Sequence, residues 1–141
     1  MIKQAIALCT IFLICMTVNG QELKCKKFKT GTFMIPGNEN VPTTTVKRSK
    51  TSQFESISED DFMVLDIEWI DDCNYVLKTN VEKTPAKRVT EMDKGIDKAG
   101  GLRIQMLKTV KDTMYFRAVA TINGKDFPLE GIQIKVSKRY K

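Results

Sequence analysis

Apolar and polar residues alternate with a period of two in several separate segments of this chain. The clearest segment runs from Phe62 to Ile70, where every second residue is apolar: Met63, Leu65, Ile67 and Trp69. Such alternation places apolar side chains on one face of a β-strand and polar side chains on the other. The same pattern occurs over residues 102–107, 114–122 and 132–137. It predicts a mainly β protein in which the strand at 62–70 lies in the centre of the core.

Turn signals separate further segments with strand character. Residues 27–35 are rich in aromatic and β-branched residues and precede a Pro-Gly-Asn sequence, which predicts a strand that ends in a turn. Residues 43–49 and 51–57 contain many Thr and Ser residues, which is typical of exposed or edge strands. A further strand is expected at 73–79, and Asn123-Gly124 is a strong hairpin signal.

Between residues 80 and 100 the apolar period becomes that of a helix. Thr84 is suited to cap a helix and Pro85 to occupy its first position. Apolar residues then follow at helical spacing until a Gly-Gly pair: Val89, Met92, Ile96 and Ala99. The whole pattern predicts a mainly β (α+β) fold, an antiparallel sheet or half-barrel meander similar to that of lipocalins, with one short helix.

The first 20 residues have the pattern of a secretory signal peptide. Lys3 precedes an apolar run from Ala5 to Val18, and short side chains lead to a cleavage position after Gly20. The run is too short for a membrane span, and Ile14 before Cys15 does not fit a lipidation site. We expect residues 1–20 to be the signal and residues 21–141 a single β-rich domain, exported to the periplasm or the extracellular space, with no membrane span after cleavage.

Export determines how the cysteines are interpreted. Without the signal peptide, Cys25 and Cys73 are the only two, and an oxidising compartment favours a disulfide between them. Two free buried thiols are the alternative. The chain contains no histidine, so the usual zinc sites and a cysteine nucleophile with an imidazole base are excluded.

Acidic residues are concentrated between Glu55 and Asp72, with no Lys or Arg among them: Glu55, Glu59, Asp60, Asp61, Asp66, Glu68, Asp71 and Asp72. Asp66 and Glu68 would lie about 6.6 Å apart on one strand face, a separation that a glycosidase could use. Asp60-Asp61 or Asp71-Asp72 could offer oxygen ligands to calcium, but the EF-hand spacing is absent. A solvated acidic face is the interpretation favoured here.

Basic residues form three groups in a chain whose net charge is +6: Lys24, Lys26, Lys27 and Lys29; Lys47, Arg48 and Lys50; Lys135, Lys138, Arg139 and Lys141. They could form a surface for a polyanion. Interleaved aromatic residues are few and RNA-binding signatures are missing, so no nucleic-acid partner is expected. The positive charge is also typical of a soluble exported protein.

Apolar side chains on the predicted strands have two interpretations: Met63, Trp69, Met106, Met114 and Phe116. Such stripes are usually core, but the same faces could line a pocket. The sequence contains no nucleophile elbow, phosphate loop, dinucleotide fingerprint or zinc-protease motif. No catalytic, cofactor-binding or metal-binding residue is therefore predicted.

Two sequence patterns stand out: CxxFxTGxF, from Cys25 to Phe33, and WxDDCxYxL, from Trp69 to Leu77, with TSQFE at residues 51–55 between them. Together they resemble the patterns of a family of small exported proteins of Bacteroidetes, particularly flavobacteria. Some members of that family carry an automatic topoisomerase IV label, which this short chain does not support because it has no ATP or DNA-cleavage apparatus. The resemblance implies that Cys25 and Cys73 belong to one recurring pattern.

The sequence thus favours a non-enzymatic binding or envelope-associated module with an unknown envelope or extracellular partner. It would use a strand edge or a basic face. A small barrel that binds an apolar ligand is the alternative, and a hydrolase based on Asp66 and Glu68 is the enzymatic alternative. The oligomeric state is not predicted.

Overall fold

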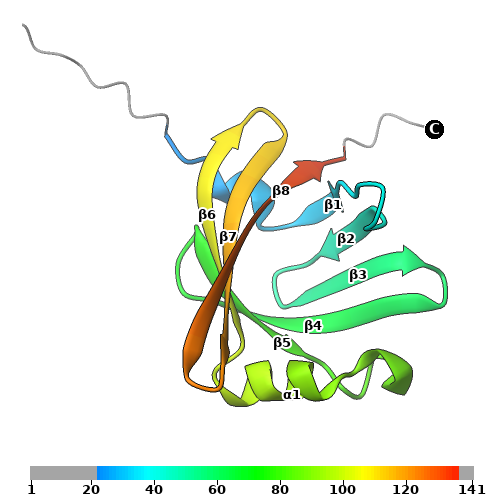
Figure 1. Ribbon diagram of the computed structural model, residues 1–141. Coiled ribbons are helices and arrows are strands. Elements are labelled where there is room, and N and C mark those ends of the chain that lie inside the picture. The colour runs from blue at the N-terminus through cyan, green and yellow to red at the C-terminus, as the bar shows by residue number, and fades with distance from the viewer. Residues whose placement is uncertain (1–21, 137–141) are drawn as a thin grey trace, which may run out of the picture.

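The computed structural model describes residues 22–136, so the predicted signal peptide at 1–20 lies outside the described residues. Eight strands form a closed barrel in which each strand is antiparallel to its neighbours (Figure 1). They follow the chain order around the barrel: β1 Gly31–Ile35, β2 Thr44–Arg48, β3 Ser52–Ser58, β4 Asp61–Trp69, β5 Asn74–Thr79, β6 Leu102–Val110, β7 Thr113–Ile122 and β8 Lys125–Lys135. The predicted mainly β, lipocalin-like meander is confirmed.

Alternation along the strands divides side chains between the barrel interior and the outer surface. In β4, Leu65 is buried, whereas Asp66 and Glu68 on the opposite face are exposed. Inward residues of neighbouring strands lie side by side, as Leu65 does opposite Gln53. The buried apolar side chains form one cluster: Cys25, Phe28, Phe33, Val46, Leu65, Tyr75, Leu77, Ile104, Met106, Met114, Phe116 and Ala118.

A short 3-10 helix, η1 (Cys25–Phe28), closes one end of the barrel, and Phe28 is fully buried there. Lys135, the last residue of β8, donates from Nζ to the carbonyl oxygens of Lys27 and Thr30. The seam between β1 and β8 is short, since only two residue pairs join the strands. The Lys135 contacts therefore connect β8 to the chain before β1 where strand pairing is sparse.

The opposite end of the barrel carries the helix α1 (Glu91–Lys98), which lies between β5 and β6 in the chain and contacts β5 and β7 (Figure 1). Thr90 is its N-cap. The Thr90 hydroxyl accepts a hydrogen bond from the Asp93 amide, and the Asp93 carboxylate accepts one from the Thr90 amide, which completes a capping box.

The helix begins at Glu91, so the predicted start at Pro85 is wrong. Thr84 is buried and bonds to the backbone of β4: its Oγ1 accepts from the Val64 amide at 2.9 Å and donates to the Val64 carbonyl at 3.1 Å. Pro85 precedes a separate 3-10 turn, η2 (Ala86–Arg88). Thr84, which the sequence pattern predicts to be a helix cap, therefore forms a tertiary contact with β4 instead.

Three strand predictions also need correction. Residues 27 and 28 belong to η1, so the first strand begins only at Gly31. β2 and β3 are paired on both sides, because closure of the barrel leaves them in its wall rather than at an edge. β8 begins at Lys125, since its pairing with β7 continues to the turn at Asn123-Gly124, where both φ angles are positive.

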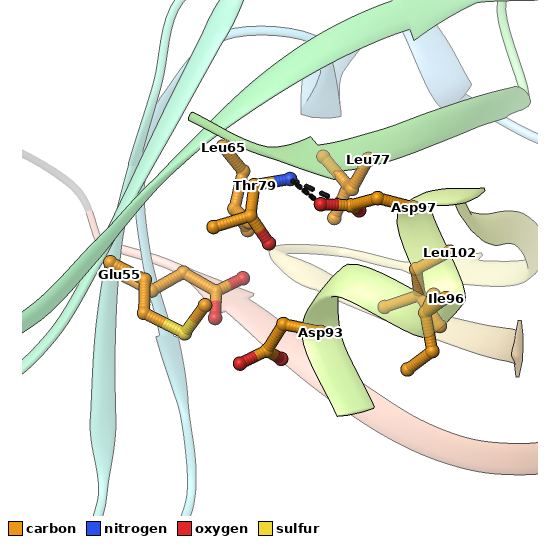
Figure 2. Close-up of a pocket in the computed structure, with 9 residues that line it drawn as sticks. Glu55, Leu65, Leu77, Thr79, Asp93, Ile96, Asp97 and Leu102 are labelled. Atoms are coloured by element: carbon orange, nitrogen blue, oxygen red, sulfur yellow. Dashed lines mark hydrogen bonds between the residues drawn. The ribbon is translucent and has the colours of Figure 1, made fainter. Parts of the chain in front are cut away.

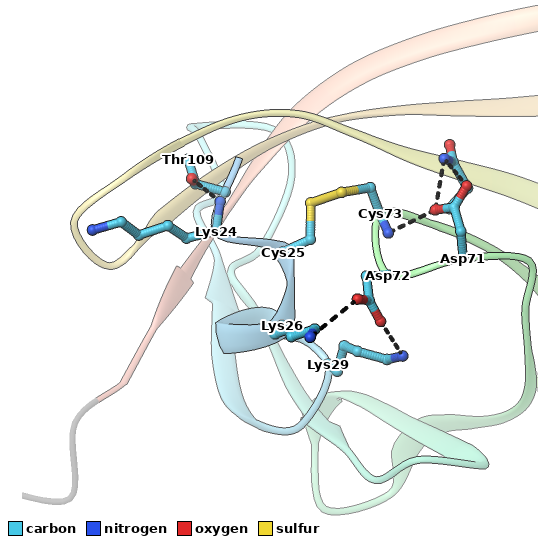
Figure 3. Close-up of a disulfide and its surroundings, with 9 residues drawn as sticks. Lys24, Cys25, Lys26, Lys29, Asp71, Asp72, Cys73 and Thr109 are labelled. Carbon is cyan, nitrogen blue, oxygen red and sulfur yellow. Dashed lines mark hydrogen bonds and ion pairs between the residues drawn. A yellow bond between two sulfur atoms is a disulfide. The ribbon is translucent and has the colours of Figure 1, made fainter. Parts of the chain in front are cut away.

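The predicted disulfide between Cys25 and Cys73 is present, with Cα atoms 5.1 Å apart, and the free-thiol alternative is wrong. It connects η1 to the turn between β4 and β5 (Figure 3). Asp72 in that turn pairs with Lys29 at 2.9 Å and with Lys26 at 3.8 Å. Among the helices of residues 22–136, none has the length and apolar character needed to cross a bilayer.

Candidate functional site

A cavity of about 140 Å³ lies between the barrel wall and α1, and it is partly open to solvent. Figure 2 shows the residues around it. The walls are largely apolar: Met63 and Leu65 from β4, Leu77 from β5, Ile96 from α1 and Leu102 from β6. The polar residues are Glu55, Thr79, Asp93 and Asp97, and the lining contains no Lys or Arg. This cavity is smaller than the roughly 300 Å³ typical of pockets for drug-sized ligands.

The helix α1 presents three side chains to the cavity. Asp93, Ile96 and Asp97 are spaced three and four residues apart, so they share one face of the helix. Asp93 accepts hydrogen bonds from the amide and hydroxyl of Thr90 at 2.8 and 2.7 Å. Both carboxylate oxygens of Asp97 accept from the Thr79 amide at 3.2 Å, at the end of β5. Both aspartates thus have structural partners that fix their positions.

Glu55 is the acidic residue of the barrel wall itself. It points inward from β3, and its neighbours in register are Val46 on β2 and Met63 on β4. Its Oε1 accepts a hydrogen bond from Gln53 Nε2 at 2.5 Å. The side chain keeps some exposed surface toward the cavity, yet protein atoms surround it, and this burial raises its pKa. The positive charges of Arg48 and Arg88 lower the pKa but do not offset the burial.

Arg48 forms a buried polar layer on the η1 side of Glu55. It donates from Nε to Gln53 Oε1 at 2.6 Å, from Nη1 to the Phe28 carbonyl at 2.8 Å and from Nη2 to Gln133 Oε1 at 2.7 Å. Burial lowers the pKa of Arg48, because the interior disfavours its charged form. Gln53 then links this guanidinium to Glu55 through a single chain of hydrogen bonds.

Two aromatic rings pack against the Arg48 guanidinium. Its central carbon lies 4.8 Å from the ring centroid of Phe33 and 5.1 Å from that of Tyr75, which places the cation over aromatic faces. The buried Tyr75 hydroxyl interacts electrostatically with Arg48 but has no hydrogen bond of good geometry within the described residues. Burial raises the pKa of Tyr75, so the hydroxyl stays neutral.

The hydrolase alternative has no geometric support. Asp66 and Glu68 are exposed on the outer face of β4, away from the cavity that Leu65 helps to line. The Asp66 carboxylate accepts hydrogen bonds from Asn80 Nδ2 at 3.1 and 3.3 Å. For these two residues the structure matches the interpretation of a solvated acidic face.

Three of the four aspartates considered as calcium ligands contact groups of this chain, and the fourth, Asp60, is exposed. Asp61 lies 2.8 Å from Arg88 Nε, and Asp72 pairs with lysines near the disulfide. Asp71 accepts from the Cys73 amide and from Asn74 Nδ2, which lowers its pKa (Figure 3). Nowhere in residues 22–136 do three His, Cys, Asp or Glu side chains gather in an arrangement that could hold a metal ion.

Several residues of the three basic groups form contacts within the fold. Arg48 is buried in the barrel, although the sequence grouped it with Lys47 and Lys50. Lys27 pairs with Asp112 at 2.6 Å, and Lys135 is bound to backbone carbonyls. Three further basic residues lie outside the described residues: Lys138, Arg139 and Lys141. Among the described basic residues, Arg48, Lys27 and Lys135 are therefore engaged by other groups of this chain.

The apolar side chains that could belong to the core or to a pocket are found in both places. Met106, Met114 and Phe116 are buried in the core, whereas Met63 lines the cavity. Trp69 packs on Tyr75 with ring centroids 4.6 Å apart. The inward positions of Arg48 and Glu55 were missed by sequence reasoning. The available signal was the spacing of two that places Arg48 on the same strand face as Val46.

The fold and the cavity define a small up-and-down β-barrel with a partly open interior, the general architecture of lipocalins. No known protein family, curated protein or solved structure matches this chain.

Proposed function

We propose that this protein is an exported, non-enzymatic binding barrel that holds a small ligand with an apolar part in the cavity beside α1. The observation that carries the proposal is the cavity itself, which has five apolar side chains in its wall and remains partly open. Pockets of this kind, with mostly apolar walls and a few polar groups, are typical of small-molecule binding sites.

The dimensions of the cavity limit the ligand. A volume of about 140 Å³ corresponds to about five water-sized groups at roughly 30 Å³ each. A short-chain amphiphile therefore fits better than a long fatty acid or a sterol. The polar layer around Arg48 fills the barrel on the η1 side of the cavity, so the ligand would enter from the side of α1.

Titration calorimetry with six-carbon probes tests this proposal. Hexylamine, 1-hexanol and hexanoate carry the same chain with different head groups, and at least one of them should bind the mature protein. Ile96→Trp fills the cavity from α1 and should weaken that binding at least about tenfold. Met92→Trp, on an exposed position of the same helix, is the matched control and should bind as the unaltered protein does. No heat with any probe, or equal binding to both variants, would contradict the proposal.

A protein partner in the envelope or outside the cell is the second candidate, supported by a different observation. Phe127 and Leu129 on β8 are 53% and 70% exposed, although both lie on its inward face opposite Ala120 and Ala118. Crosslinking in the native envelope should capture a partner that Phe127→Ser/Leu129→Ser loses and that Val81→Ser, an exposed apolar position elsewhere, retains. Equal capture by both variants would exclude this face of β8 as the docking surface.

A further inference from the structure

We infer that the cavity selects a monovalent organic cation, a short amphiphile whose ammonium group contacts Glu55 while its apolar chain lies along Met63, Leu65 and Leu77. The inference rests on the proposed binding function and names the class of ligand. It follows from the charges of the cavity, from the partners of each carboxylate and from the chemistry of the walls.

The charge of the cavity is opposite to that of the chain. Lys and Arg exceed Asp and Glu by 23 to 17 in the whole sequence, yet the cavity lining contains three carboxylates and no basic residue. Figure 2 shows Glu55 from the barrel wall and Asp93 from α1 beside the same space. In such a partly dehydrated space, the field of the carboxylates favours a cation and disfavours an anion.

Glu55 differs from the two aspartates in what its carboxylate contacts. Both oxygens of Asp97 accept from the Thr79 amide at the end of β5, whereas Asp93 accepts at Oδ2 alone, from the amide and hydroxyl of Thr90 in the cap of α1. Glu55 accepts one hydrogen bond, from Gln53 to Oε1, and within residues 22–136 no second hydrogen bond reaches the carboxylate. Its Oε2 is therefore available to a donor in the cavity.

Arg48 does not neutralise Glu55 directly. Its three nitrogen atoms donate to Gln53, Gln133 and the Phe28 carbonyl, and no ion pair within 4.0 Å joins it to Glu55 in the described part of the chain. A buried carboxylate without a direct counter-charge is costly, and a cationic ligand would offset that cost. Burial also raises the pKa of Glu55, which is consistent with a missing counter-charge.

The chemistry of the walls favours an organic cation over a metal ion. The other cavity residues are mainly Leu, Ile and Met, which offer no oxygen ligands to Ca²⁺ or Mg²⁺. The three carboxylates are not arranged to hold a metal ion among the described residues. An alkylammonium needs only one carboxylate for its charge and apolar surface for its chain, and this cavity supplies both.

Calorimetry with matched head groups separates this inference from the proposed function. At neutral pH, hexylamine should bind at least about tenfold more tightly than 1-hexanol, and hexanoate should not bind detectably. Glu55→Gln should remove the preference: hexylamine affinity should fall about tenfold or more, while 1-hexanol affinity should not fall. Glu68→Gln, which changes an exposed carboxylate on the outer face of β4, is the matched control and should keep the preference.

Each contrary outcome has a defined meaning. If 1-hexanol or hexanoate binds as tightly as hexylamine and Ile96→Trp blocks it, the binding function stands and the cation inference is wrong. If no probe binds, both are wrong. Circular dichroism establishes whether Glu55→Gln is folded. If it is not, the ranking of the three probes on the unaltered protein and the weakening of hexylamine binding by added salt decide the matter.

Discussion

Arg48 is held in the barrel interior by three hydrogen bonds and two aromatic rings, so each of its three guanidinium nitrogens donates to an acceptor of this chain. Loss of this side chain would leave two glutamine oxygens and the Phe28 carbonyl buried without donors. A buried acceptor that loses its partner costs more than the hydrogen bond gained on folding, because water cannot replace the donor.

Arg48→Met should therefore lower the free energy of unfolding by about 3 to 5 kcal/mol, the usual cost of removing one partner from a buried charged network. Urea denaturation measures the change. Lys47→Met, the exposed neighbour on the outer face of β2, serves as the control and should change stability by less than about 0.5 kcal/mol. A loss below about 1 kcal/mol for Arg48→Met would mean that the network contributes little.

Glu55 makes stability depend on pH. Its pKa in the folded protein is raised above the ordinary value of 4.5, so the folded state binds more protons than the unfolded state between the two values. The free energy of unfolding should consequently decrease as the pH rises through that window. The charged groups that act on Glu55 are Arg48 and Arg88, and both lower its pKa without offsetting the burial.

Chemical denaturation at a series of pH values from 4.5 upward checks the sign. Glu55→Gln should flatten the decrease, and Glu68→Gln should leave it unchanged. Four exposed aspartates have lowered pKa values and contribute stability that is lost as the pH falls: Asp71, Asp72, Asp112 and Asp126. These aspartates titrate at lower pH than Glu55 does. They are also present in the unaltered protein, in Glu55→Gln and in Glu68→Gln, so they do not affect the comparison. A rise in stability through the window would contradict the burial of Glu55.

At the scale of elements, η1 is held to the barrel by the disulfide and by polar contacts. The Lys24 amide donates to Thr109 Oγ1 at 2.9 Å, and Lys27 Nζ donates to the Lys111 carbonyl at 2.9 Å. These contacts attach η1 to the end of β6 and the turn that follows it. The disulfide attaches the same helix to the turn after β4.

Cys25→Ala/Cys73→Ala should lower the free energy of unfolding by about 4 kcal/mol, because the bridge closes a loop with a sequence separation of 48 residues. Urea denaturation of the double variant and of the reduced unaltered protein should give similar losses. Intact mass after alkylation verifies which thiols are free. If the unreduced unaltered protein takes up two alkyl groups, the bridge is absent in solution.

Sequence patterns predicted which strands and helices form better than they predicted where these elements end and what they contact. Alternation identified the strand at 62–70 because one of its faces is buried and the other solvated. The N-terminal half of β8 escaped the pattern, since residues 125–130 are exposed on both faces. The predicted helix start was wrong because the Thr84 hydroxyl forms hydrogen bonds with the backbone of β4. The spacing of residues in the sequence does not reveal such a contact between distant segments.

The candidate site was largely beyond sequence reasoning. Glu55 belongs to an acidic run, and Arg48 belongs to a basic run, so composition placed both on the surface. Only the alternation within β2 and β3, combined with closure of the barrel, turns them inward. Closure itself depends on two residue pairs between β1 and β8, which no local pattern predicts.

At the scale of the whole molecule, the barrel is joined at this short seam, and Lys135 reinforces it. Its Nζ lies 5.8 Å from the ring centroid of Phe33 and donates to two carbonyls near η1. Opening of the barrel should therefore begin between β1 and β8, since the other pairs of neighbouring strands share longer ladders.

Lys135→Met should speed amide hydrogen exchange in β1 and at the end of β8 while leaving β6 and its pairing with β7 protected. The expected loss of global stability is about 1 to 3 kcal/mol, from two lost charged hydrogen bonds. Lys125→Met, at the exposed far end of β8, is the control and should not change exchange in β1. Uniform acceleration throughout the barrel would show that the seam is not its weakest point.

The disulfide also changes the covalent topology of the molecule. Because Cys25 is bonded to Cys73, the chain between them is a closed ring that contains β1 to β4. The connection between β1 and β2 is exposed from Asn38 to Thr43, where a protease can reach it. A single cut there opens the ring but separates nothing, so the cleaved protein remains one covalent molecule until the disulfide is reduced.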